Sequence, residues 1–92
     1  MVVDTKFQLA QHAMFQKVVD ETVILDTQSG QYYTLDVIAT EMVELLNNGQ
    51  TVSEVVSTIF DNYDSQKAVI EQDLQELIKE MQSKGLLVEK QA

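Results

Sequence analysis

The stretch from residue 21 to residue 54 constrains the fold of this chain more than any other part. It reads ETVILDTQSGQYYTLDVIATEMVELLNNGQTVSE. Residues 22–26 and 31–35 are rich in β-branched and aromatic side chains, which favours two strands. The intervening TQSG is a turn, and its Gly30 can adopt the positive φ that a longer hairpin loop requires at its end. We therefore predict a β-hairpin, and we expect an earlier strand within residues 13–18.

The strand over residues 31–35 is the first candidate for a binding surface. Side chains alternate between the two faces of a strand, so Tyr33 and Leu35 share one face and Tyr32 and Thr34 share the other. We expect Tyr33 to be part of the core. Tyr32 is then either an exposed aromatic at a binding surface or is covered by the N-terminal segment.

Three helices are expected after the hairpin. Asp36 is a suitable N-cap for the first, Gly49 ends it, and residues 51–54 (TVSE) form a capping box that opens the second. The third runs over about residues 66–84, with Asp64-Ser65 as its predicted cap, and residues 86–88 form an extended tail. The predicted buried residues are Ile38, Met42, Leu45 and Leu46, then Val52, Val55, Val56, Ile59 and Phe60, then Ile70, Leu74, Leu77, Ile78 and Met81.

These elements predict an α+β fold, winged helix-turn-helix-like, in which a three-stranded antiparallel sheet is followed by three helices. Ninety-two residues are enough for one domain with one modest core. We expect residues 1–12 to be an N-terminal arm or a frayed segment and residues 13–92 to be the folded domain.

Composition excludes several classes of function. The chain has no cysteine and a single histidine, His12, which we interpret as a surface residue, so we expect no catalytic centre, no metal site and no cofactor. Fifteen acids face six lysines and no arginine, giving a net charge of -9, which opposes binding to nucleic acid or to an anionic membrane. No apolar run is long enough for a signal peptide or a membrane span, so we expect a cytoplasmic protein.

Two clusters of polar residues have competing interpretations. Asp73, Glu76 and Glu80 lie on one side of the third helix, either as a solvated face with lysine pairs or as an electrostatic rim for a basic partner. Asp64-Ser65 resembles the modified serine of acyl carrier proteins, but the apolar residue expected after the serine is missing. Helix capping is therefore the preferred role for that dipeptide.

The chain resembles a known family. The segments LDTQSGQYYTLD, IATEMVELLNNGQTVSEVV and EMQSKGLL are together similar to the PqqD-like proteins, the recognition elements for precursor peptides that are ribosomally made and then modified. The resemblance covers roughly residues 22–88. Residues 26–30 lack the proline- and acid-containing segment of the pyrroloquinoline-quinone member, and the chain is closer to the stand-alone elements of lasso-peptide pathways.

The resemblance implies a non-catalytic domain that binds the leader segment of a precursor peptide by strand addition. The leader would pair with residues 31–35, lie against residues 69–81, and be delivered to a leader protease and then to a modifying enzyme such as a macrolactam synthetase. The candidate peptide-binding residues are Gln31, Tyr32, Tyr33, Thr34, Leu35, Val69, Asp73, Leu74, Glu76, Leu77 and Glu80. No proline, glycine or lysine interrupts residues 31–35, so this strand edge could pair with another copy of the chain. We therefore expect a monomer or an edge-paired or domain-swapped dimer. The alternative is a winged-helix-like regulator that acts through protein–protein contacts.

Overall fold

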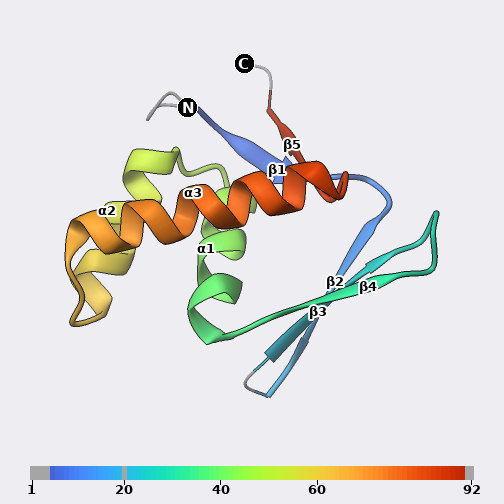
Figure 1. Cartoon of the computed structure of the whole chain (residues 1–92), viewed down its shortest axis with the longest axis horizontal. Coiled ribbons are helices and arrows are strands. Elements are labelled where there is room, and N and C mark those ends of the chain that lie inside the picture. Colours follow the sequence, from blue (N-terminus) through green and yellow to red (C-terminus); the bar gives the residue numbers. More distant parts are fainter. Residues whose placement is uncertain (1–4, 20, 91–92) are drawn as a thin grey trace.

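Three antiparallel strands form the main sheet of this computed structural model, which describes residues 5–19 and 21–90. They are β2 (Ala13–Val18), β3 (Glu21–Asp26) and β4 (Tyr32–Leu35), in the order β2-β3-β4, so β4 lies at an edge (Figure 1). Ile24 on β3 pairs with Phe15 on β2 and with Tyr33 on β4, and all three side chains therefore share the inner face. The predicted hairpin and the strand within residues 13–18 are confirmed.

Three helices follow the sheet, and local capping explains where the first two begin. They are α1 (Val37–Asn47), α2 (Val52–Asn62) and α3 (Lys67–Ser83). The Asp36 carboxylate accepts the Ala39 N–H at 2.8 Å. Thr51 and Glu54 exchange the two bonds of the capping box, at 3.2 and 2.9 Å. The predicted three-stranded sheet followed by three helices is thus confirmed.

The start of α3 differs from the prediction. Its N-cap is Gln66, and no side chain forms a cap hydrogen bond there. Asp64 and Ser65 precede the N-cap and are outside the position from which a side chain normally reaches the first free N–H groups. The expected cap by Asp64-Ser65 is therefore wrong.

The core lies between the inner face of the sheet and the helices. Ile24, Val43, Leu74 and Ile78 are fully buried at its centre. Two predicted core residues are exposed instead: Ile38 at 40% and Phe60 at 46%. Ile38 is exposed because α1 packs against α2, β1 and β3 as well as α3. The side of α1 that these elements bury carries Val43 and Leu46 instead.

A second, two-stranded sheet joins the two ends of the chain. β1 (Phe7–Leu9) pairs antiparallel with β5 (Leu87–Glu89), and the two strands lie side by side in Figure 1. Phe7 is only 3% exposed and belongs to the core. The expected arm over residues 1–12 is therefore wrong for residues 7–9, because a long-range partner strand orders them; residues 1–4 lie outside the described part. Among the described helices, none is long and apolar enough to cross a membrane.

Candidate peptide-binding site

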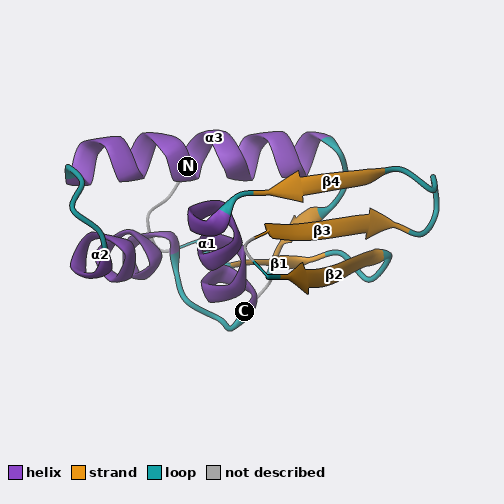
Figure 2. Cartoon of the chain, turned by 90° about the horizontal axis from the view of Figure 1, so that it is seen from below, coloured by secondary structure: helices purple, strands orange, loops and turns teal. Residues whose placement is uncertain are grey.

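The free edge of β4 is the first component of the candidate site. Among the described residues, β4 pairs with β3 on one side only, and Figure 2 shows it as the strand of its sheet that lies nearest α3. The Asp26 N–H donates to the Gln31 carbonyl at 2.8 Å, which sets the phase of the antiparallel ladder. In that phase Tyr33 and Leu35 bond back to β3, so Tyr32 and Thr34 direct their backbone N–H and C=O groups to the free edge.

A pocket between α1 and α3 is the second component, and we call it the groove pocket. Its volume is about 320 Å³. The lining residues are Asp36, Ile38, Ala39 and Met42 from the start of α1, with Asp73, Glu76, Leu77 and Glu80 from α3. Apolar side chains therefore adjoin carboxylates from both helices, an arrangement that suits an apolar side chain with basic neighbours.

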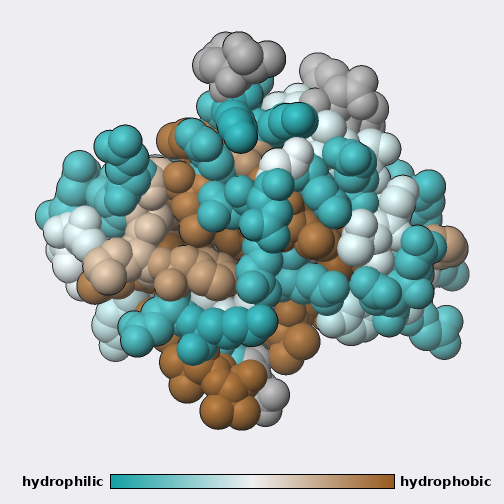
Figure 3. Space-filling view, turned by 180° about the vertical axis from the view of Figure 1, so that it is seen from behind, coloured by the Kyte–Doolittle hydropathy of each residue, from teal (hydrophilic) through white to brown (hydrophobic). Residues whose placement is uncertain are grey.

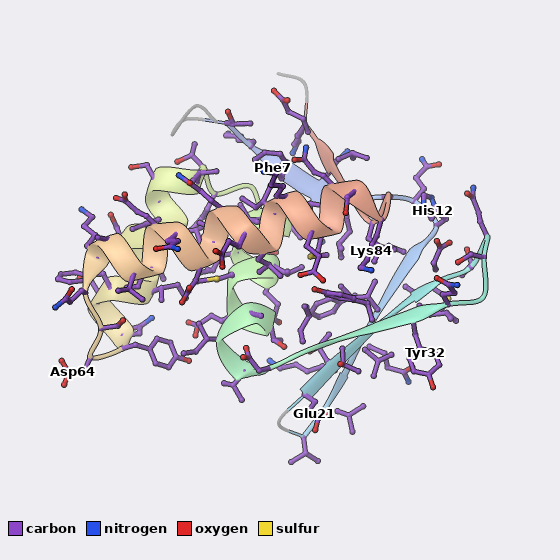
Figure 4. The ribbon with its side chains drawn as sticks, in the orientation of Figure 1. Phe7, His12, Glu21, Tyr32, Asp64 and Lys84 are labelled. Atoms are coloured by element: carbon purple, nitrogen blue, oxygen red, sulfur yellow. The ribbon has the colours of Figure 1, made fainter. Side chains whose placement is uncertain are left out.

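A smaller pocket, the strand-end pocket, lies at the other end of β4. It has a volume of about 270 Å³ and includes Tyr32, Tyr33, Lys84 and Leu86 among its lining residues. The Lys84 ammonium lies 5.5 Å from the centre of the Tyr33 ring, within the range of a cation–π interaction. Figure 4 shows Lys84 projecting from the end of α3 toward the sheet.

Glu80 connects the two pockets electrostatically. Burial raises the pKa of the Tyr33 phenol to about 12, and the neighbouring Glu80 carboxylate adds to this shift by accepting its hydrogen bond and by its negative charge. The phenol therefore remains a neutral hydrogen-bond donor through the physiological range. The phenol therefore lies near a carboxylate of α3, on the side of β4 that faces this helix.

In the part of the chain that the structure describes, the carboxylates of the groove pocket form no ion pair with a lysine. Within the described residues, the single ion pair joins Lys17 and Glu44, so the pairs of Glu76 with Lys79 and of Glu80 with Lys84 that a solvated face would offer are not formed. The Glu76 carboxylate accepts only a long, 3.5 Å bond from the Gln72 amide. This arrangement favours the electrostatic rim over the paired surface as the interpretation of the acidic row.

The structure separates the predicted contact residues into exposed and buried sets. Leu35 and Leu74 are 3% and 0% exposed and line neither pocket, so their side chains belong to the core and are unavailable to a ligand. Gln31 precedes β4 and lines the strand-end pocket, whereas Val69 is exposed but lines neither pocket. The remaining predicted residues lie at the strand edge or in the two pockets: Tyr32, Tyr33, Thr34, Asp73, Glu76, Leu77 and Glu80.

Sequence reasoning missed the contribution of α1 to this site. Asp36, Ile38, Ala39 and Met42 line the groove pocket. Ile38 and Met42 had been predicted as core, and Asp36 as a cap only. The signal in the sequence was the apolar first turn of α1, Val37-Ile38-Ala39. In the structure, the side chains of Val37 and Ile38 are 51% and 40% exposed.

Comparison with protein families now decides the affiliation of this chain. The model of coenzyme PQQ synthesis protein D (PqqD) matches residues 21–87. The chain belongs to the PqqD family. The matched region of this PqqD-family protein begins with β3 and includes β4, all three helices and the start of β5, and therefore contains both pockets.

Two similar solved structures were determined with a leader peptide. TbiB1, determined in complex with the TbiA(β) leader peptide, is 26% identical, with a TM-score of 0.84 and coverage of 92% of this chain and 99% of that one. A lasso peptide synthetase B1 complexed with the leader peptide has the same fold, at 23% identity and TM-score 0.84, with coverage of 90% of this chain and 98% of that one. The heterocyclase TruD contains the fold within 12% of its length, at 17% identity and TM-score 0.66, over 94% of this chain. No curated protein matches the sequence significantly.

Proposed function

We propose that this PqqD-family protein is a non-catalytic recognition element for the leader segment of a ribosomally synthesised precursor peptide. It would bind the leader by strand addition to β4 and deliver it to a leader protease or modifying enzyme, in lasso-peptide biosynthesis. The observation that carries this proposal is the unpaired edge of β4 beside the groove pocket. Support comes from TbiB1, which is similar over nearly its whole length and was solved with a leader peptide.

Strand addition accounts for how a short, flexible segment could be recognised. Backbone hydrogen bonds to the outward groups of Tyr32 and Thr34 would supply about 1 kcal/mol net each. Side chains of the leader on the inner side would enter the groove pocket and the strand-end pocket, which lie near opposite ends of β4. Selection would then depend on these two pockets, and we expect micromolar affinity or somewhat tighter.

The acidic lining defines which leaders fit best. Asp36, Asp73, Glu76 and Glu80 surround Ile38, Ala39, Met42 and Leu77. A leader with an apolar side chain for this pocket and lysine or arginine beside it would satisfy both kinds of surface. The same charges would accelerate encounter at low ionic strength.

Backbone methylation of the leader tests this proposal directly. The probe is the leader of the precursor encoded beside the gene, with one N-methyl group placed in turn on each residue of its central segment and binding measured by calorimetry. We expect every second methyl group to weaken binding about tenfold, because alternate N–H groups point toward β4. Equal affinities for all methylated peptides would contradict strand addition, and absence of binding by the unmodified leader would contradict the proposed function.

A further inference from the structure

A pocket of about 400 Å³, which we call the hairpin pocket, lies apart from the candidate peptide site. Lys17, Val19 and Glu21 line it from the ends of β2 and β3. From α1 it is lined by Val37, Thr40, Glu41 and Glu44. These α1 residues occupy the opposite side of the helix from Ile38, Ala39 and Met42, which line the groove pocket, given 3.6 residues per turn.

The hairpin pocket has an excess of negative charge. Its three glutamates face one lysine, Lys17, whose ammonium is 3.3 Å from the Glu44 carboxylate. The Glu41 carboxylate accepts the Tyr63 hydroxyl at 2.7 Å and the Asn62 amide at 3.5 Å. The Glu21 carboxylate forms no hydrogen bond or ion pair with the part of the chain that the structure describes. A cationic group entering the pocket would therefore find carboxylate charge that is not neutralised.

An unpartnered hydroxyl lies in the wall of the same pocket. Thr40 is 4% exposed, and its Oγ1 has no hydrogen-bond partner among the described residues. Leaving a buried hydroxyl unsatisfied lowers stability relative to an isosteric methyl group, so a valine would be the more stable choice in the free protein. A threonine in a helix has two accessible χ1 rotamers, and rotation of this side chain would present Oγ1 to a donor in the pocket.

Two of the lining residues are exposed valines. Val19 is 92% exposed and Val37 is 51% exposed. Figure 3 shows hydrophobic atoms gathered at the lower edge of the molecule, where the tip of the β2–β3 hairpin lies. Apolar side chains grouped at such a position mark a contact surface for another protein more often than isolated exposed residues do.

We propose that the hairpin pocket docks the enzyme that receives the captured leader. A lysine or arginine projecting from an apolar surface of that enzyme would enter the pocket. Its aliphatic stem would lie across Val19 and Val37, and its charged head would meet Glu21 and Glu44 and donate to Thr40. This inference rests on the proposed function, because it requires a second protein that accepts the leader.

The placement of the two pockets on opposite sides of α1 gives the proposal its functional meaning. The enzyme would bind without covering β4 or the groove pocket, so leader and enzyme could be held by the same domain at the same time. The free end of the leader would then be presented to the enzyme at a raised local concentration.

Two substitutions with a matched control test this proposal by calorimetry, using the purified leader protease encoded beside the gene with saturating leader present. Glu21→Lys should weaken protease binding at least about tenfold, because it reverses an unpaired charge. Thr40→Val should weaken it about tenfold without lowering the melting temperature, because the valine keeps the packing and removes the acceptor. Glu89→Lys makes the same charge change on β5, far from the hairpin tip in Figure 1, and should change binding less than about twofold.

Leader affinity measured on the same proteins separates the two proposals. All three variants should bind the leader as the unaltered protein does. If leader binding persists while the protease binds Glu21→Lys and Thr40→Val unchanged, or fails to bind the unaltered protein, the docking proposal is overturned. If the unaltered protein does not bind the leader, the proposed function fails instead.

Discussion

The Lys84 ammonium lies 5.5 Å from the centre of the Tyr33 ring. This contact joins the C-terminal end of α3 to β4, two elements that the chain connects only through α1 and α2. Glu80, one turn earlier on α3, acts on the phenol of the same tyrosine. The Tyr33 ring of the strand-end pocket therefore lies near a lysine ammonium, and its phenol lies near the Glu80 carboxylate, which lines the groove pocket.

The Tyr33 phenol predicts a pH dependence of stability. Its pKa is raised from the ordinary value of 10.0 to about 12, mainly by burial and secondly by Glu80. A raised pKa contributes stability that is fully present below pH 10 and is lost as the pH rises through about 12. The unfolding free energy of the unaltered protein should thus fall more steeply over this interval than that of Tyr33→Phe. Denaturant titrations at several pH values measure the unfolding free energy of both proteins. If the two free energies change with pH in parallel, the raised pKa of Tyr33 is contradicted.

Alanine substitutions of Tyr32 and Leu74 should separate effects on leader binding from effects on stability. Tyr32 is 72% exposed at the strand edge, so Tyr32→Ala should weaken leader binding about tenfold and change the unfolding free energy by less than about 0.5 kcal/mol. Leu74 is fully buried, and Leu74→Ala should lower the unfolding free energy by about 2–5 kcal/mol. Calorimetric binding and urea unfolding check both. A strongly destabilised Tyr32→Ala protein with unchanged affinity would place Tyr32 in the core.

Asp73 tests the electrostatic rim. Asp73→Lys should weaken the binding of a basic leader about tenfold at low ionic strength. This loss of affinity should become smaller as salt is added, because salt screens interactions between exposed charges. Glu71→Lys is the matched control: it makes the same charge change on the same helix, at an exposed residue that does not line the groove pocket. Equal effects of the two substitutions would show that only net charge matters and would refute a localised rim.

Ile38 tests the contribution of α1. Ile38→Ala should weaken leader binding about fivefold, because the side chain lines the groove pocket and would cover apolar surface of the leader. Val88→Ala truncates another aliphatic side chain that is also 40% exposed, on β5, and should leave the affinity unchanged. Both variants should remain close to the unaltered protein in melting temperature. An Ile38→Ala protein that binds the leader normally would remove α1 from the site.

The fold could be predicted where local chemistry determines it. Asp36, the Thr51–Glu54 capping box and the glycines after α1 and α3 fix helix ends through contacts within a few residues, and sequence reveals such contacts directly. The β1–β5 pairing could not be predicted, because Phe7 meets Glu89 across almost the whole chain and both strands are only three residues long.

The candidate site was less accessible to prediction than the fold. Alternation along β4 correctly distinguished exposed Tyr32 from partly buried Tyr33. A helical stripe, however, does not reveal which of its apolar residues faces the core, because that depends on how many elements surround the helix. Ile38, predicted as core, lines the groove pocket for this reason; Leu74, predicted both as core and as a contact, is enclosed in the core. The contact residues themselves, and the predicted edge-paired or domain-swapped dimer, remain predictions.

An amide NMR titration of isotope-labelled protein with the leader of the precursor encoded beside the gene tests the central claim most directly. We predict that the largest shifts fall on β4, on Asp36, Ile38, Ala39 and Met42 of the groove pocket, and on residues 73–84. The amides of Tyr32 and Thr34 should become protected from solvent exchange. An unperturbed spectrum at high peptide excess, or shifts confined to other surfaces, would contradict leader capture at the β4 edge.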